Sequence, residues 1–200
     1  MAATLQMLSG NRFILGIGAG WRDDEYKAYG YEFPRPAVRF AELEELIQIC
    51  RLMWTQDAPT FVGKHFHITE AAAPPKPEIV PPVCIGAYGE QIGLPMVGRL
   101  ADMWNASTQG SVDRWLIKRD IVRASAEKSG RDPNEIHLSL TVEKPLPSTD
   151  AESEILRTEL QIMADHGVEH FVMDFGHPQS TEPVMRFVEQ VMRPMKAARK

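Results

Sequence analysis

The stretch Arg12-Phe-Ile-Leu-Gly-Ile-Gly-Ala-Gly20 joins a short apolar run to closely spaced glycines. Residues 13–17 are almost all apolar, which is typical of a strand buried on both faces of a parallel sheet. Gly16, Gly18 and Gly20 lie at the carboxyl end of that run. The stretch therefore predicts a buried parallel strand that ends in a tight turn.

Strands and helices alternate on both sides of this stretch. The clearest helical stripes are at residues 40–54, with Phe40, Leu43 and Ile47, and near the carboxyl end of the chain. We expect strands at 13–17, 83–86, 101–105, 137–142 and 168–173, and a hairpin at 61–68. We expect the end of a helix at 5–8, helices at 36–55, 111–129 and 151–165, and helices that begin near Glu90 and at Thr181. This alternation predicts parallel strands joined by right-handed crossovers. The pattern alone suits either an open doubly wound sheet or part of an eight-stranded barrel, which takes about 250 residues.

Composition narrows the classes of function. The 200 residues are 44% apolar and 24% charged, as in ordinary globular proteins, and the net charge of −5 argues against a nucleic-acid partner. Cys50 and Cys84 form no CxxC motif. Because there is no long apolar run and no basic leader, the sequence predicts a cytoplasmic protein without a membrane partner.

Several segments, in order and at matching spacing, resemble the luciferase-like family of flavin-dependent oxidoreductases. The matching segments are residues 3–21, 25–30, 39–40, 44, 52–54, 74–77, 82–90 and 101–105. The resemblance is good over residues 2–106 and weaker, but in register, to the end of the chain. It implies a (β/α)8 barrel in which residues 1–200 form a single partial domain of about five β/α units, without the first three.

That departure at the front has consequences for the expected assembly. The missing units would carry residues that help to seat the isoalloxazine ring. A five-stranded remnant has two open sheet edges, which favours pairing with another chain. The resemblance also implies a homodimer, and we treat a misplaced start, an internal start or the edge of a cloned segment as explanations for Met1.

Two glycine-containing turns are the candidates for cofactor binding. Gly18, Ala19 and Gly20 follow the first strand, where glycines let a flat ring or a phosphate approach the backbone. A dinucleotide fingerprint is excluded because position 21 is Trp and acidic residues follow it. The second turn consists of Gly86, Ala87, Tyr88 and Gly89, whose N–H groups can form an anion nest. The alternative for both turns is ordinary strand-to-helix packing, and Arg99 is the nearest basic candidate.

The remaining site candidates lie at the ends of predicted strands. Trp21 is expected to stack on a ligand or to form a pocket wall, although some F420-using relatives carry glutamate there. Asn105 and Thr141 are assigned to the substrate pocket, with turn capping as the alternative for Asn105. Glu143 and Asp174 are candidate acids or bases, and a solvent-facing role competes with each.

The sequence thus supports three hypotheses. The first is an oxidoreductase that acts on a small organic substrate, either by hydride transfer with F420 or by oxygen activation with FMN. The resemblance of the loop at residues 85–90 favours F420. The second is a non-catalytic remnant or an assembly subunit that pairs through open edges. The third, a metal-dependent hydrolase built on His65 and His67, lacks an evident third ligand, so we expect no metal.

Overall fold

A computed structural model describes residues 1–177 and 180–198 of the chain. It contains a five-stranded sheet in the order β1-β4-β5-β6-β7 and a separate two-stranded hairpin, β2-β3. The chain divides into two compact units, which are described one at a time below: residues 1–104 with 117–136, and residues 105–116 with 137–200. The single-domain boundary expected from the sequence stays a prediction.

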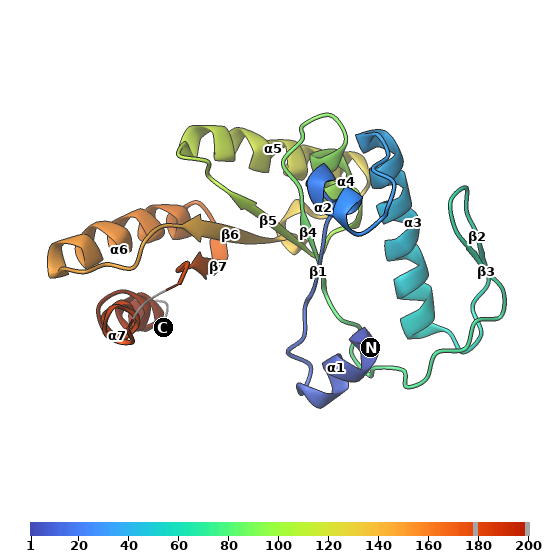
Figure 1. Ribbon diagram of the computed structural model, residues 1–200, viewed down its shortest axis with the longest axis horizontal. Helices are drawn as coiled ribbons and strands as arrows, with labels where there is room; N and C mark the ends of the chain where they lie inside the picture. The colour runs from blue at the N-terminus through green and yellow to red at the C-terminus, as the bar shows by residue number, and fades with distance from the viewer. Residues whose placement is uncertain (178–179, 199–200) are drawn as a thin grey trace. The chain divides into compact units, whose positions relative to one another are not determined.

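The first unit contains the apolar stretch at residues 12–20, which includes strand β1 (Figure 1). Its elements are α1 (Ala2–Leu8), β1 (Leu15–Ile17), α2 (Asp23–Ala28), α3 (Pro36–Thr55), β2 (Phe61–Val62), β3 (His67–Ile68), β4 (Val83–Gly86), α4 (Gly93–Leu100), the start of β5 (Met103–Ser107) and most of α5 (Val112–Lys128). Strand β1 runs parallel to β4, with Leu15 opposite Val83 and Ile17 opposite Ile85. The predicted parallel pairing is therefore confirmed for these two strands.

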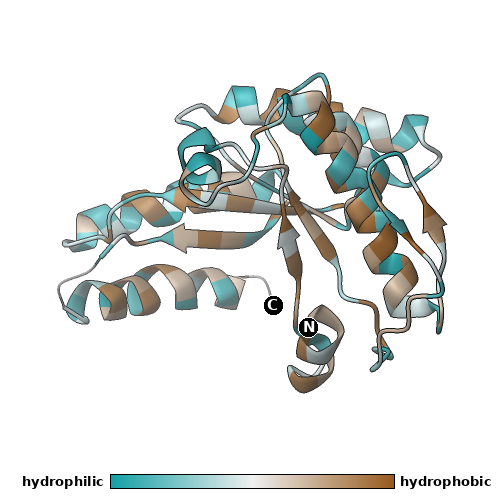
Figure 2. Ribbon diagram, turned by 45° about the vertical axis from the view of Figure 1, so that its right-hand side comes forward, coloured by the Kyte–Doolittle hydropathy of each residue, from teal (hydrophilic) through white to brown (hydrophobic). Residues whose placement is uncertain are grey.

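Apolar residues from the strands and the helices form the core of the first unit. Figure 2 shows mostly hydrophobic residues on the strands and mixed hydropathy along the helices, as expected for helices with one buried face. The side chains that are almost fully buried come from α3, β4, α4 and β5: Leu43, Ile47, Val83, Ile85, Leu94, Met96, Val97 and Trp104. This core sets the positions of the turns that follow β1 and β4.

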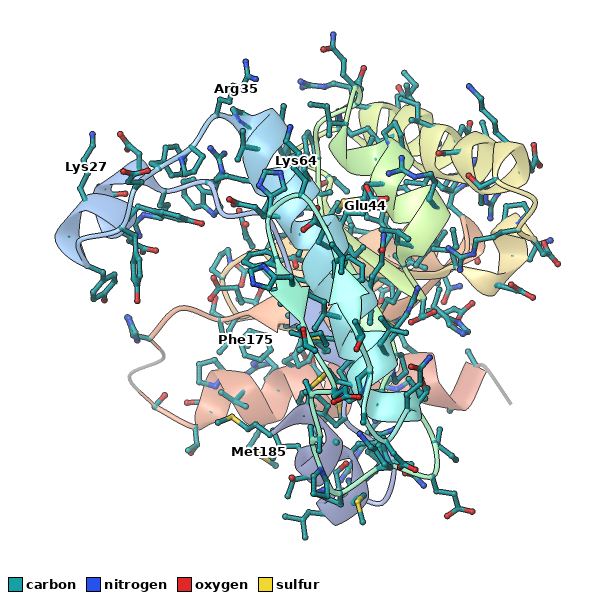
Figure 3. All side chains as sticks on the ribbon, turned by 90° about the vertical axis from the view of Figure 1, so that its right-hand side faces the viewer. Lys27, Arg35, Glu44, Lys64, Phe175 and Met185 are labelled. Atoms are coloured by element: carbon teal, nitrogen blue, oxygen red, sulfur yellow. The ribbon has the colours of Figure 1, made fainter. Side chains whose placement is uncertain are left out.

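Helix α3 also holds the β2–β3 hairpin beside it (Figure 1). The Glu45 carboxylate accepts hydrogen bonds from the backbone N–H groups of Lys64, His65 and Phe66 at 2.7, 2.9 and 2.8 Å. On the same helix, Glu44 pairs with Arg99 of α4 at 2.7 Å; Glu44 and Lys64 are labelled in Figure 3. The Glu45 carboxylate thus attaches the hairpin to α3.

The second unit is built from two long parallel strands and their helices. Its elements are the end of β5, the start of α5, β6 (His137–Glu143), α6 (Asp150–Asp165), β7 (Val168–Asp174), α7 (Glu182–Phe187), a π-helical turn (Val188–Met192) and α8 (Arg193–Ala198). Thr149 and Glu152 form a reciprocal capping box at the start of α6. In β6, Leu138, Leu140 and Val142 are buried, and they alternate with residues that occupy the other face.

The structure differs from the sequence expectations at element ends. Residues 23–28 form the short helix α2, in a segment where the sequence predicted no helix. Helix α4 begins at Gly93, three residues later than expected. Thr181 occupies the position before α7, but its side chain makes no capping hydrogen bond, because its own backbone is already helical.

Candidate cofactor site

The two predicted glycine turns lie side by side in the first unit. Since β1 and β4 are parallel and in register, both turns leave the same edge of the sheet. A methyl group added at Gly18 would come within 3.2 Å of the carbonyl oxygen of Gly86. The sequence therefore brings residues 18–20 and 86–89 together, at the edge where α/β enzymes bind their ligands.

The turn after β1 is held from behind by Arg39 of α3. The guanidinium donates to the carbonyls of Ala19 at 3.1 Å, Gly20 at 3.4 Å and Pro34. It lies 3.9 Å from the centre of the Phe33 ring, and the residue is only 9% exposed. A buried guanidinium that uses carbonyls as acceptors orders this turn and leaves positive charge close to it.

Gly20 is required by the shape of the same turn. Its φ of +74° lies in the left-handed region, and a Cβ there would come within 2.5 Å of the Tyr26 hydroxyl. Tyr26 in turn packs edge-on against Phe33, with ring centroids 4.9 Å apart. The glycine at position 20 is thus explained by local geometry, and its assignment to the cofactor stays a prediction.

The turn after β4 is held by two buried side chains. Trp104 Nε1 donates to the Ala87 carbonyl at 2.9 Å, and Lys118 Nζ donates to the Tyr88 carbonyl at 3.1 Å. Lys118 also pairs with Glu90 at 2.7 Å and lies 4.2 Å from the centre of the Tyr88 ring. Gly86 and Gly89 remain exposed, so this turn has a supported inner side and an open outer side.

Tyr88 contributes an unusual polar group to this turn. Its hydroxyl is buried and has no hydrogen-bond partner among the described residues. A buried hydroxyl without a partner costs about 1–3 kcal/mol. Such an unsatisfied group beside a candidate ligand-binding turn is typical of a site that is completed by a ligand or by water.

Trp21, the predicted pocket residue, projects into solvent in this structure. Its side chain is 82% exposed, with the Arg22 guanidinium 5.7 Å from its ring centre. The other three tryptophans of the chain, Trp54, Trp104 and Trp115, are buried. Trp21 follows the Gly18–Gly20 turn directly, and its role toward a ligand stays a prediction.

The second unit brings together the predicted pocket residues Asn105 and Thr141. Thr141 donates its hydroxyl proton to Asn105 Oδ1 at 2.8 Å, and Asn105 Nδ2 donates to the Ser139 hydroxyl at 2.8 Å. Ser139 continues the row to His170 Nδ1 at 3.0 Å. The two amide atoms of Asn105 are therefore used within the protein, which supports a role in ordering the strands; contact with a substrate stays a prediction.

The two carboxylates that the sequence proposed as acid or base also come together. Glu143 and Asp174 are opposite each other at the carboxyl ends of the parallel strands β6 and β7. Both residues are exposed, and Asp174 accepts a hydrogen bond from the Gly176 N–H at 2.9 Å. Their position at strand ends suits chemistry, and their assignment as catalytic groups stays a prediction.

Cys84 and the hairpin histidines are the remaining candidates for a nucleophile and for metal ligands. Burial raises the pKa of the Cys84 thiol to about 11, so it stays protonated at neutral pH and is a poor nucleophile. His65 lies 3.8 Å from Glu42, and His67 is exposed on β3. Within residues 1–177 and 180–198, no three His, Cys, Asp or Glu side chains gather in a metal-binding group.

Sequence reasoning missed two of the side chains that shape the turns. It named Arg99 as the nearest basic residue, but Arg99 pairs with Glu44, and the cation that contacts the 86–89 turn is Lys118. A lysine in a helix normally indicates a solvated face, so only the distance in space reveals Lys118. Arg39 lay in a segment that matched the family, but nothing in its local pattern indicated carbonyl binding.

Together these features define an α/β protein with parallel β/α units and a candidate ligand site at the carboxyl ends of its strands. The chain belongs to the luciferase-like monooxygenase family, whose family model matches residues 1–190. Among the described helices, none combines the length and the apolar character needed to cross a bilayer.

Named relatives of this chain carry out redox reactions. A phthiodiolone/phenolphthiodiolone dimycocerosates ketoreductase of Mycobacterium kansasii is 31% identical over 198 residues, which covers 91% of this chain and 53% of that protein. An F420-dependent glucose-6-phosphate dehydrogenase of Amycolatopsis mediterranei is 29% identical over 141 residues, which covers 70% of this chain and 42% of that protein. The chain therefore spans about half the length of the curated relatives it matches.

Solved structures support the same fold. An F420-dependent secondary alcohol dehydrogenase in complex with an F420-acetone adduct matches with a TM-score of 0.63 and 22% identity, over 98% of this chain and 58% of that chain. An EDTA monooxygenase from Chelativorans matches with a TM-score of 0.63 and 18% identity, over 84% of this chain and 43% of that chain. These likenesses confirm the predicted fold class, a luciferase-like barrel type with part of its β/α units.

Proposed function

We propose that this chain carries the cofactor-binding part of an F420- or FMN-dependent oxidoreductase that acts on a small organic substrate. The observation that carries the proposal is the adjacency of residues 18–20 and 86–89 at one sheet edge. Glycines at both turns leave the backbone open to a flat ring or a phosphate. The names of the relatives, an F420-dependent dehydrogenase and a ketoreductase, support the redox class.

The residues present suit a flavin-type group in three respects. The two turns are open on one side, and on the other side their carbonyls accept hydrogen bonds from buried cations. In addition, the Tyr88 hydroxyl has no hydrogen-bond partner among the described residues. A bound deazaflavin or flavin supplies the redox chemistry, and the protein supplies binding and orientation. Gly18 to Gly20 and Gly86 to Gly89 would hold the cofactor, with Trp21 at its edge.

The experiment that tests this proposal is a titration of the purified chain with F420 and, separately, with FMN. Ligand fluorescence and protein tryptophan fluorescence are both followed, because Trp21 is exposed beside the turn. We expect saturable micromolar binding of at least one cofactor, and the tighter of the two names the cofactor. A folded chain that binds neither would exclude the proposal.

A second candidate function is assembly through the edges of the sheet. Within the described residues, strands β1 and β7 are the end strands in the sheet order, and each pairs on one side only. Unpaired strand edges favour association with another chain, and a homodimer is the simplest form. Sedimentation over a range of concentrations tests this candidate: a monomer at all concentrations argues against it, whereas a dimer that binds no cofactor would favour it over the oxidoreductase.

A further inference from the structure

Lys118 is a buried cation that joins helix α5 to the turn after β4. Its side chain is only 8% exposed. The ammonium lies 2.7 Å from Glu90 Oε1, 3.1 Å from the Tyr88 carbonyl oxygen and 4.2 Å from the centre of the Tyr88 ring. Burying an ammonium group costs several kcal/mol unless it is well paired. The three contacts therefore fix the turn firmly against the helix.

The contacts with the carbonyls also determine where the neighbouring N–H groups point. In a planar trans peptide the C=O and the following N–H point in opposite directions. Because the Tyr88 carbonyl is turned toward Lys118, the Gly89 N–H is turned away from it. The same holds one peptide earlier, where Trp104 binds the Ala87 carbonyl and turns the Tyr88 N–H outward.

The Tyr88 N–H thus points away from Trp104 and the Gly89 N–H away from Lys118, and Gly89 is exposed. Neither has a hydrogen-bond partner in the part of the chain that the structure describes. A Cβ added at Gly89 would meet no atom within 4 Å. Successive free N–H groups form a concave site for an anion.

We propose that Lys118 is a positioning residue, which directs the N–H groups of Tyr88 and Gly89 at the phosphate of the cofactor. This inference rests on the proposed function, since FMN carries a phosphate monoester and F420 a phosphodiester. Glu90 neutralises the ammonium, so Lys118 acts through the orientation of the peptide and not as a free charge in the site. Its effect is therefore specific for ligands with a phosphate.

The test compares ligands with and without phosphate on the full chain. The dissociation constants of FMN and riboflavin are measured, and likewise those of F420 and its phosphate-free chromophore. We expect the phosphate-bearing ligand to bind more tightly to the wild type. Lys118→Met should weaken the binding of that ligand about tenfold, which corresponds to the loss of roughly one charge-assisted hydrogen bond. The binding of the phosphate-free ligand should change little.

Two variants serve as controls. Lys118→Arg keeps a cation and should restore most of the preference for phosphate, whereas Lys128→Met, at the exposed end of α5, should match the wild type. Thermal melting checks the fold of each variant. If Lys118→Met does not fold, Lys118→Gln takes its place, and the wild-type preference needs no variant at all.

The outcomes separate this inference from the proposed function. Equal wild-type affinity for FMN and riboflavin, or for F420 and its chromophore, would overturn the phosphate role while leaving cofactor binding intact. Equal weakening of both ligands by Lys118→Met, with a lower Tm, would reduce Lys118 to a structural residue. Absence of binding for all four ligands would overturn the proposed function and this inference together.

Discussion

At the scale of single residues, the two glycine turns of the candidate site are held by buried cationic side chains. Arg39 binds the carbonyls of Ala19 and Gly20, and Lys118 binds the carbonyl of Tyr88, each in a turn whose other side is open. A turn alone is a weak indication of a ligand site, because every strand-to-helix connection has one. Two adjacent turns whose carbonyls are bound by buried cations form a more specific arrangement, since buried cations are costly to retain.

Trp21 gives a prediction at this scale that needs no ligand. Because it is 82% exposed while Trp54, Trp104 and Trp115 are buried, iodide should quench roughly a quarter of the tryptophan emission. Trp21→Phe should remove the iodide-sensitive fraction without lowering the Tm. If the variant is still quenched by iodide, another indole is accessible and Trp21 is not the exposed one.

The same variant tests the predicted pocket role of Trp21. If the indole lies against a bound cofactor, saturating ligand should protect it from iodide. Trp21→Phe should then weaken cofactor binding. Full iodide access in the saturated protein would place Trp21 outside the pocket.

At the scale of elements, helices α4 and α5 approach each other closely at Gly98. A Cβ there would come within 2.5 Å of the Val122 carbonyl oxygen and 2.6 Å of Ser125 Cβ. Gly98→Ala should therefore destabilise the protein by about 1–3 kcal/mol, through overpacking against the backbone. Urea denaturation measures the change. Gly16→Ala, where an added Cβ meets no atom within 4 Å, is the matched control, and equal stability of the two variants would refute the close packing.

The attachment of the β2–β3 hairpin gives a pH prediction. Burial raises the pKa of Glu45, but three backbone N–H groups outweigh this effect and hold the pKa below its ordinary value. A lowered folded-state pKa means that this stabilisation is present above the unfolded-state pKa and is lost as the pH falls through the folded-state pKa. Glu45→Gln should thus destabilise the protein at pH 7 and much less in acid.

Urea midpoints at neutral and acid pH, for the wild type and Glu45→Gln, measure this difference. Glu127→Gln on the exposed side of α5 is the control, and it should show no such pH dependence. A destabilisation by Glu45→Gln that is the same at both pH values would mean that shape, and not charge, holds the hairpin.

Elements with a regular pattern were predictable from the sequence, and side-chain partnerships were not. The apolar runs at 83–86 and 137–142 became β4 and β6, because buried strands need uninterrupted or alternating apolar residues. The α2 helix at 23–28 has no buried residue, so its sequence contains no hydrophobic pattern that would predict a helix. Lys118 and Arg39 act over 20 to 30 residues of sequence separation, which local pattern does not reveal.

For the whole molecule, cofactor binding should appear as a change in stability. A ligand that binds only the folded state raises the free energy of unfolding by about 2.7 kcal/mol at a concentration of 100 times its Kd. For a chain of this size, each kcal/mol corresponds to about 2–4 °C in Tm, so the expected rise is about 5–11 °C. Differential scanning fluorimetry with FMN, F420 and NAD as an unrelated control measures this shift.

Hydrogen exchange shows which residues a bound cofactor protects, and so whether the rise in Tm comes from binding at the proposed site. Both glycine turns belong to the first compact unit, which holds residues 1–104. Hydrogen exchange in the presence of the effective cofactor should therefore slow at residues 18–21 and 86–89, while α6 stays unchanged. A Tm rise with protection confined to residues 137–174 would move the cofactor to the second unit, beside Asn105 and Thr141, and would remove the glycine turns from the site.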